Sequence, residues 1–365
     1  VVVAVPENHA ATCGAKKVGA QQAQKAEDAG YSMDLCSYAR IDIGTAFDSG
    51  RGSPSNGLPK PDLLISCTNN CSLLSKWFDV HHRELGVPHI VLDVPFCYGP
   101  QQEKDLNYIL TQYQDLIAKL EDITGQQYDP AKVQEAWRYS VESYQQWQRF
   151  LDTAAHRPAG ITAFDTFLHM APALTFYRGT PTIVEHFKLL AEEAEAKIAN
   201  GNVPVPNERY RLLWDNIAPW HQLRRISSWL AERDANLIAA TYTSCIGRLE
   251  GGVDWQTSPD ADPLSELARA QNFSVCPYGL ELRYNSLAAL VNRLQPDGII
   301  FSSNRSCKPY SLMQMDLQRR VEAELGLPAV MIDCDMADER FYNEAQAFLR
   351  IEALLERIDS QRGST

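Results

Sequence analysis

The chain has 365 residues, of which 45% are hydrophobic, and it carries a formal net charge of −12 at pH 7. This length and composition can supply a large core and suggest two domains. The negative charge argues against a nucleic-acid-binding protein, because phosphate contacts need a basic surface. No apolar run approaches the roughly 20 residues that a helix needs to cross a bilayer, so we predict no membrane contact.

The chain opens with the apolar run Val1 to Val5, which predicts a buried first strand. This opening lacks the basic start and the long apolar core of a signal peptide, which favours a cytoplasmic protein. Because the sequence begins directly on this expected strand, we expect a natural N-terminal segment to be missing from this numbering. A turn and a helix should follow, with Pro6 in the first helical turn.

Strand-like and helix-like segments then alternate along the chain. A short strand-like run precedes Cys36, and another helix start follows it. From about 101 to 200, apolar residues recur three and four positions apart, which predicts helices. The segment 201–208 is expected to be a linker, and 209–365 returns to alternating strands and helices, closing with an amphipathic helix.

One pattern occurs twice, at 61–96 and at 296–336. Each copy opens with Pro-Asp and a short apolar run, passes a polar turn containing Asn, and reaches a cysteine, Cys71 or Cys307. A helix-length segment ending in Glu-Leu-Gly then leads to a second apolar run that is closed by an aspartate. This order predicts a βαβ unit with parallel strands in each copy.

We therefore predict an α/β fold of two Rossmann-like lobes with parallel sheets, related by internal duplication, and a helical segment between them. The expected ranges are 1–150 for the first lobe, 151–203 for the helical segment and 204–365 for the second lobe. The sequence has no G-x-G-x-x-G after a strand-like run, so the lobes need not bind a nicotinamide. It also has no Walker A sequence, so any ATP hydrolysis belongs to a partner.

Nine cysteines in a chain without a secretion signal favour metal binding or buried thiols over disulfides. Cys36, Cys71 and Cys307 each follow a strand-like run and precede a helix-like one. Such turns lie at the carboxyl edge of a parallel sheet, and the free N–H groups of a helix start favour a thiolate. If the two lobes face each other, three thiolates meet in one cleft and suit an iron–sulfur cluster or zinc.

Seven motifs occur in an order that resembles one protein family. They are PENHAATCGA, GYSMDLCSYARIDIG, PKPDLLISCTNNC, GVPHIVLDVPF, NRSCKPYS, DCDMADER and FLRIEALLE. Together they resemble the 2-hydroxyacyl-CoA dehydratases and ATP-dependent benzoyl-CoA reductases over nearly the whole chain. The resemblance implies two related subunits, each with a 4Fe-4S cluster held by three cysteines between two Rossmann-like lobes. By motif these ligands are Cys36, Cys71 and Cys307; Cys67 competes with Cys71, which the internal repeat favours.

The resemblance also implies a reaction and partners. In the dehydratases, an ATP-hydrolysing iron–sulfur activator delivers an electron that reduces the thioester carbonyl to a ketyl radical anion. The radical anion expels the neighbouring hydroxyl, a β-proton is lost, and the electron returns with the enoyl-CoA product. In the reductases the electrons stay in an aromatic ring. We predict a dehydratase subunit in a heterodimer with a related second subunit; the alternatives are a reductase subunit and a non-catalytic electron-relay subunit.

Two residues after the first expected strand are candidates for catalysis. Glu7 is a candidate base for the β-proton or a holder of the leaving hydroxyl, and it resembles an acidic residue that the family places near the substrate. Its alternative role is to favour the helix start through the helix dipole. His9 is the second candidate, with a structural role as its alternative.

Polar residues beside the cysteines are candidates for contacts with the cofactor. Asn69, Asn70 and Asn304 could donate hydrogen bonds to cluster sulfurs, or form turns and caps. Arg305 and Lys308 could offset the cluster's charge or contact CoA phosphates, or could be solvated charges.

The remaining expectations concern structure and assembly. We expect Asp335, Asp338 and Arg340 to form an ion pair between a loop and a helix, and His81 and His82 to face solvent. The region 101–200, with the aromatic segment 164–177, is the candidate interface with the second subunit. The cysteines expected not to bind the cluster are Cys13, Cys97, Cys245, Cys276 and Cys334.

Overall fold

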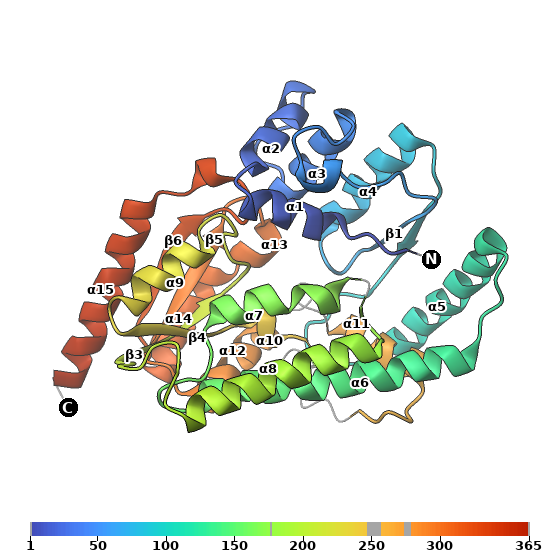
Figure 1. The fold of residues 1–365 in the computed structure, drawn as a ribbon. Helices are drawn as coiled ribbons and strands as arrows, with labels where there is room; N and C mark the ends of the chain where they lie inside the picture. The colour runs from blue at the N-terminus through green and yellow to red at the C-terminus, as the bar shows by residue number, and fades with distance from the viewer. Residues whose placement is uncertain (1, 176, 247–256, 274–278, 364–365) are drawn as a thin grey trace.

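A computed structural model describes residues 2–175, 177–246, 257–273 and 279–363 of the chain. The fold is α/β with two parallel sheets and many helices (Figure 1). Helices α1 to α4 and the smaller sheet form one end of the molecule, and the longer helices α5, α6 and α8 lie across from them. In the part of the chain that is described, no helix combines the length and apolar character needed to span a membrane.

The N-terminal part carries a sheet of two parallel strands among four helices. The elements are α1 (Pro6–Ala15), α2 (Gly19–Asp28), α3 (Ser37–Phe47), η1 (Pro54–Asn56), β1 (Leu64–Cys67), α4 (Ser72–Leu85) and β2 (His89–Leu92). Helix α4 ends at Gly86, whose φ of +65° is the left-handed conformation that favours glycine after a helix.

Four helices form the middle of the chain. They are α5 (Glu103–Thr124), α6 (Pro130–Asp152), α7 (Ala163–His169) and α8 (Pro181–Ala199), with the short 3-10 turns η2 (Thr153–Ala155) and η3 (Ala171–Leu174). The sequence encodes two of the starts: Asp129 caps α6 by accepting from the Ala131 N–H at 3.0 Å, and Thr162 with Asp165 forms a capping box on α7. The expectation of a helical region is confirmed.

The C-terminal part contains a parallel four-stranded sheet in the order β4-β3-β5-β6. Its strands are β3 (Tyr210–Asp215), β4 (Ala235–Ala240), β5 (Gly298–Asn304) and β6 (Ala329–Cys334). Its helices are α9 (Leu223–Ala231), α10 (Thr241–Ser244), α11 (Pro263–Asn272), α12 (Leu280–Leu294), α13 (Lys308–Ser311), α14 (Gln314–Leu325), η4 (Glu339–Phe341) and α15 (Glu344–Gly363). Every residue of β3 and β4 is buried, as expected for a parallel sheet covered on both faces.

Both copies of the repeat form βαβ units. In the first, β1 pairs with β2 in parallel from Leu64 opposite His89 onward. In the second, β5 pairs with β6 in parallel from Ile299 opposite Ala329 onward, and the connecting helix is divided into α13 and α14. The predicted parallel βαβ unit is therefore confirmed in each copy.

Two expectations for the N-terminal part differ from the structure. Residues 2–5 form no strand, and Val2 is 89% exposed. The strand-like run before Cys36 is also a turn rather than a strand. Valine favours a strand only when a neighbouring strand pairs with it, and β1 pairs only with β2 among the described residues. The α/β class is confirmed, whereas the Rossmann-like character of both lobes and the limits at 150 and 203 stay predictions.

The hydrophobic core connects these parts. The larger core cluster joins Trp147 of α6 and Phe187 of α8 to Trp214 and Phe301 of the four-stranded sheet. A second cluster holds α1 to α4 together and includes Ala337, from the loop after β6. Helix α2 starts so close to this loop that a Cβ on Gly19 would lie 2.0 Å from the Ala337 carbonyl oxygen. The N-terminal helices therefore pack directly against the C-terminal part. We call α1 to β2 the N-terminal lobe and β3 to α15 the C-terminal lobe.

Candidate functional site

The three cysteines predicted to act together each occupy the residue before a helix. Cys36 precedes α3, Cys71 precedes α4 and Cys307 precedes α13. The Cys71 sulfur accepts from the Leu73 N–H at 3.4 Å, which is a helix-capping contact. All three side chains are half-buried and pack against the same hydrophobic cluster. All three sulfurs thus belong to residues at helix starts, and among the described contacts the Cys71 side chain makes a capping hydrogen bond whereas those of Cys36 and Cys307 do not.

The electrostatic surroundings of Cys36 indicate that these thiols lie near one another. Burial raises the pKa of Cys36, and the neighbouring Cys307 and Cys71 sulfurs raise it further, against the nearby Ala39 N–H. Burial likewise raises the pKa of Cys71, while the N–H groups of Leu73 and Leu74 oppose the rise. Thiols with raised pKa values are protonated near neutral pH, so a metal would have to displace their protons.

Within the described ranges, no three His, Cys, Asp or Glu side chains form a group that could hold one metal ion. A tetrahedral zinc site needs its ligands around a single point. In an iron–sulfur cluster the cysteines bind different irons, so their sulfurs can lie further apart. The donor set of three neighbouring cysteines therefore fits a cluster better than zinc.

Cys67, the competitor to Cys71, is the last residue of β1. Burial raises the pKa of its thiol, and the Asn70 backbone N–H and the Gln271 side chain oppose the rise. Gln271 lies on α11, and Cys67 packs against the same hydrophobic cluster as Cys36 and Cys71. The charge interaction of Cys36 with Cys71 favours Cys71 as the third ligand, and the assignment stays a prediction.

The other described cysteines make different contacts. Cys13 is buried and faces His9, Cys97 contacts the Gly99 carbonyl, and the Cys245 thiol donates to the Tyr242 carbonyl at 2.8 Å. Cys334 is buried beside Ser302, and Cys276 lies outside the described residues. The eight described cysteines form no disulfide.

Glu7 lies in the first turn of α1, beside the cysteines. Burial raises its pKa, its own backbone N–H opposes the rise, and the Asp42 charge adds to it. Glu7 in turn raises the pKa of both Cys67 and Cys71, so its carboxyl group lies near them. A buried carboxyl group with a raised pKa is better suited to exchanging a proton than an ordinary solvent-exposed carboxylate.

His9 is buried within the N-terminal lobe. Its Nε2 atom lies 3.9 Å from the Cys13 sulfur, and burial lowers its pKa although the Asp42 charge opposes this. The imidazole is therefore neutral at pH 7. Its surroundings favour a structural role, and a catalytic role for His9 stays a prediction.

The asparagines beside the cysteines make different contacts. The buried Asn69 side chain donates to the Gln271 backbone carbonyl at 2.6 Å and accepts from the Gln271 side chain at 2.7 Å. The exposed Asn70 offers its backbone N–H to Cys67. The amide of Asn304 donates to the Ile217 carbonyl at 2.9 Å and accepts from Cys334. These contacts fix the turns, and donation from these side chains to a cluster sulfur stays a prediction.

Arg305 and Lys308 lie on either side of Cys307 and are exposed. Arg305 pairs with Asp333 at 3.2 Å, and the Lys308 ammonium donates to the Arg305 carbonyl at 2.6 Å. These contacts hold both cations on the outside of the Cys307 turn, and a role for either in binding the cofactor stays a prediction.

The expectation that His81 and His82 both face solvent is wrong for His81. His81 is buried, and its Nε2 atom lies 2.5 Å from the Asp42 carboxylate, which also accepts from Trp77 Nε1 at 2.8 Å. His81 follows Trp77 by four positions on α4, so it shares the buried face of that helix. This spacing was the signal in the sequence that could have placed it correctly; His82 is exposed.

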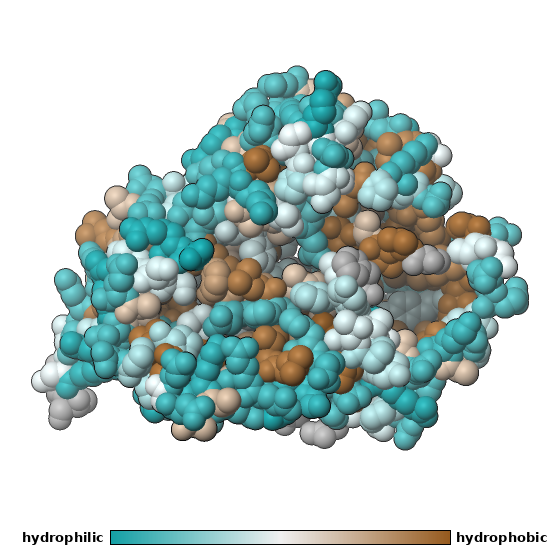
Figure 2. All heavy atoms as spheres, viewed as in Figure 1, coloured by the Kyte–Doolittle hydropathy of each residue, from teal (hydrophilic) through white to brown (hydrophobic). Residues whose placement is uncertain are grey.

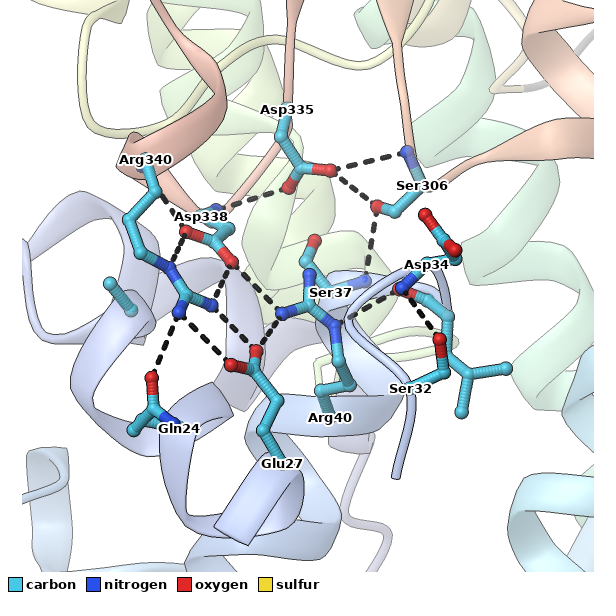
Figure 3. Close-up of polar contacts among 12 residues, drawn as sticks. Gln24, Glu27, Ser32, Asp34, Ser37, Arg40, Ser306, Asp335, Asp338 and Arg340 are labelled. Carbon is cyan, nitrogen blue, oxygen red and sulfur yellow. Dashed lines mark hydrogen bonds and ion pairs between the residues drawn. The ribbon is translucent and has the colours of Figure 1, made fainter. Parts of the chain in front are cut away.

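A buried polar network joins the two lobes beside the cysteines (Figure 3). Asp338 accepts from Arg40 at 3.0 Å and from Arg340 at 2.6 Å, and Glu27 accepts from both arginines. The predicted ion pair between loop and helix is confirmed for Asp338 and Arg340, whereas Asp335 has hydrogen bonds in place of an ion pair among the described contacts. Its two partners from the N-terminal lobe, Glu27 on α2 and Arg40 on α3, were not predicted.

Asp335 forms the second half of this network. Its carboxylate accepts from the Ser306 hydroxyl, and the Ser306 hydroxyl accepts from the Ser37 N–H at 3.1 Å (Figure 3). Ser37 follows Cys36 and Ser306 precedes Cys307. The two cysteine turns are thereby joined by hydrogen bonds.

The family model described as "2-hydroxyglutaryl-CoA dehydratase, D-component" matches residues 3–358. The chain belongs to this family. The resemblance seen in the sequence motifs is confirmed.

Three curated proteins of known name match almost the whole length of this chain. The (R)-phenyllactyl-CoA dehydratase alpha subunit of Clostridium sporogenes is 34% identical over 98% of this chain and 84% of its own length. The (R)-2-hydroxyisocaproyl-CoA dehydratase alpha subunit of Clostridioides difficile is 31% identical, over 99% and 86%. A benzoyl-CoA reductase subunit of Thauera aromatica is 29% identical, over 98% and 84%. All three relatives are named as subunits, so the chain is similar to components of multi-subunit enzymes.

Proposed function

We propose that the chain is a subunit of an oxygen-sensitive, cytoplasmic 2-hydroxyacyl-CoA dehydratase that holds one 4Fe-4S cluster. The observation that carries this proposal is the grouping of Cys36, Cys71 and Cys307 at three helix starts, with their thiols close enough to influence one another. Family membership and the two dehydratase relatives above 30% identity support the reaction class.

Cys36, Cys71 and Cys307 would hold the cluster as thiolates. When bound, the cluster supplies a one-electron redox centre with one iron that no cysteine of this chain occupies. The helix starts behind the three sulfurs stabilise their negative charge through the backbone N–H groups and the helix dipole. The hydrophobic cluster packs against the half-buried cysteines and limits their contact with water, which favours a low reduction potential.

Glu7 is the residue of this chain that would manage a proton. Its position beside Cys71 places its carboxyl group at the same end of the lobe as the proposed cluster. The raised pKa allows it to take up the β-proton of the substrate or to donate a proton to the departing hydroxyl. The substrate would be a 2-hydroxyacyl-CoA, from which water is removed through a ketyl radical after ATP-dependent one-electron activation.

The proposed complex needs two protein partners. One is a related second subunit, since the relatives are themselves named as single subunits of larger enzymes. The other is an ATP-hydrolysing iron–sulfur activator, because the sequence has no Walker A motif.

The space-filling view shows a surface that is hollowed between the lobe of α1 to α4 and the helices below it, with hydrophobic residues gathered over β1 (Figure 2). The proposed interface at 101–200 and 164–177 presents exposed apolar residues such as Tyr108 and Leu168.

A benzoyl-CoA reductase subunit is the second candidate, because the Thauera relative matches over the same extent of the chain. An electron-relay subunit that does not bind substrate is the third. The test is an anaerobic assay of the purified complex with its activator on a 2-hydroxyacyl-CoA and on benzoyl-CoA. Formation of an enoyl-CoA by a complex that contains iron would support the proposal. Reduction of the aromatic ring of benzoyl-CoA would favour the second candidate. A complex that turns over neither thioester, or that contains no iron, would overturn it.

A further inference from the structure

Two of the proposed cluster ligands lie in turns that are tied together by one serine. Ser306, directly before Cys307, accepts from the backbone N–H of Ser37, directly after Cys36, at 3.1 Å. The Ser306 hydroxyl donates to Asp335, and the Ser306 N–H reaches the same carboxylate oxygen at 3.3 Å. Ser37 and Asp335 are fully buried. This link therefore operates without competition from water, and it bridges residues 269 positions apart in the chain.

Asp335 is itself held rigidly. Its second carboxylate oxygen accepts from the backbone N–H groups of Ala337 and Asp338, each at 3.0 Å. Both carboxylate oxygens of Asp335 therefore accept hydrogen bonds, and one of them binds the backbone of the loop after β6. A carboxylate fixed by hydrogen bonds to both oxygens can determine where the Ser306 hydroxyl lies.

Helix α3 has a second and separate attachment to the same loop, the Arg40–Asp338 ion pair. Arg40 lies one helical turn beyond Cys36, and its guanidinium fixes the body of the helix against the loop. The Ser37–Ser306 link acts on the first residue of the helix, next to the sulfur. The two attachments have different consequences: one docks the lobes, and the other sets where Cys36 lies relative to Cys307.

The link also uses a donor that would otherwise be free. The Ser37 N–H is one of the N–H groups at the start of α3 that have no partner within the helix. Ser37 directly follows Cys36 in the sequence. While this N–H donates to Ser306, it is unavailable to the Cys36 sulfur. Fewer donors to sulfur and a nearby carboxylate both lower the reduction potential of an iron–sulfur centre.

We propose that Ser306 and Asp335 are positioning residues that fix the separation of the Cys36 and Cys307 turns and keep the potential of the bound cluster low. This inference rests on the proposed function, because it assigns the two residues a role toward the proposed cluster. Neither residue is a ligand; each acts through the turns that carry the ligands.

The test compares variants of the complex purified without oxygen. Ser306→Ala and Asp335→Asn remove the link, and Ser306→Thr retains the hydroxyl. Ser311→Ala is the matched control, because the Ser311 hydroxyl donates to the Asn304 carbonyl of the same turn at 2.9 Å but does not reach the other lobe. Arg340→Gln is the control for lobe docking, because Arg340 contacts Asp338 and Glu27 on the side opposite to Ser37 and Ser306 in Figure 3. The measurements are the rate of iron loss to a chelator, the midpoint potential followed by electron paramagnetic resonance, and thermal unfolding.

We expect Ser306→Ala and Asp335→Asn to lose iron roughly 10–100-fold faster, as residues behind metal ligands do, and to have a more positive midpoint. Ser306→Thr and Ser311→Ala should match the wild type in both, and Arg340→Gln should lower the melting temperature without moving the midpoint. If Ser306→Ala does not fold, the midpoint potentials of Asp335→Asn and Arg340→Gln are compared, and a more positive midpoint in Asp335→Asn alone supports the inference. Suppose that the wild-type complex contains a cluster and that Ser306→Ala and Asp335→Asn have the same midpoint potential as the wild type. This result would overturn the inference about Ser306 and Asp335 and leave the proposed function standing. A wild-type complex without iron would overturn the proposed function as well.

Discussion

Arg40 and Asp338 form a fully buried ion pair with 3.0 Å between Nη1 and Oδ2, and this pair joins α3 to the loop after β6. Arg40 also pairs with Glu27, and Arg340 completes the set by contacting both acids. Two arginines thus meet two carboxylates at the point where the lobes touch. Removing one member leaves a buried charge with fewer partners, which is more costly than the loss of an exposed pair.

Asp338→Ala should therefore destabilise the protein strongly. Loss of the buried carboxylate leaves Arg40 with Glu27 alone, and we expect a cost of about 3 kcal/mol, at the lower end for breaking a buried pair. The measurement is denaturant unfolding of the apo-protein. Asp316→Ala serves as the control, since Asp316 forms an exposed pair with Arg319 at 3.8 Å and should change the free energy of unfolding by less than about 1 kcal/mol. Equal effects of the two substitutions would contradict the prediction.

The same network predicts a loss of stability in acid. Burial would raise the pKa of Asp338, but the hydrogen bonds and charges of Arg340 and Arg40 outweigh it, and the pKa is lowered. The pKa of Glu27 is also lowered, chiefly by its hydrogen bond to Arg340. A carboxyl group with a lowered pKa stabilises the folded state fully above its unfolded pKa of about 4, and this contribution is lost as the pH falls through the folded value.

Unfolding free energies measured from pH 7 down to pH 3 should show this loss below about pH 4. In Arg340→Gln the pKa values of Asp338 and Glu27 should rise toward their ordinary range, so the acid-dependent part of the stability should shrink. An identical pH profile in wild type and Arg340→Gln would show that the network does not control acid stability.

The cysteine assignment predicts different outcomes for neighbouring thiols. Cys36→Ala, Cys71→Ala and Cys307→Ala should each abolish cluster binding and turnover, because each removes one ligand. Cys67→Ala and Cys334→Ala should keep iron at the wild-type level. The measurement is iron and acid-labile sulfide per protein after anaerobic purification. Loss of iron in Cys67→Ala with retention in Cys71→Ala would reverse the choice between them.

Glu7→Gln separates proton chemistry from cluster binding. The amide keeps the size of the side chain but cannot take up a proton, so turnover should fall about 10²–10⁴-fold while the iron content is unchanged. Glu339→Gln is a suitable control, because Glu339 is an acidic residue near α2 that takes no part in the proposed reaction. Full turnover by Glu7→Gln would remove Glu7 from the mechanism.

Much of the C-terminal lobe could be predicted from its sequence. The strands β3 and β4 are short apolar runs buried on both faces, and α12 and α15 repeat apolar residues at helical spacing. Val1 to Val5 carries an equally strong apolar signal without forming a strand over residues 2–5. The difference lies in pairing: β3 has a neighbour on both sides, which no local pattern reveals.

The candidate site was predictable in part. Cys71 and Cys307 stand at equivalent places of a repeat, and the structure puts both before a helix, as expected. The partners of Ser306 and Asp338 could not be predicted, because Ser37 and Arg40 come from the other lobe and are brought to them only by docking. The burial of His81, in contrast, was predictable from its helical spacing to Trp77 on α4.

The order of the three cysteines along the chain has a consequence for biosynthesis. Cys36 and Cys71 leave the ribosome tens of seconds before Cys307 at about 5–20 residues per second. The proposed cluster requires all three thiols, so it cannot form on the nascent N-terminal lobe, whose helices α1 and α2 pack against Ala337 of a segment not yet made. Iron and sulfide for this proposed cluster would therefore be delivered only after Cys307 has been made.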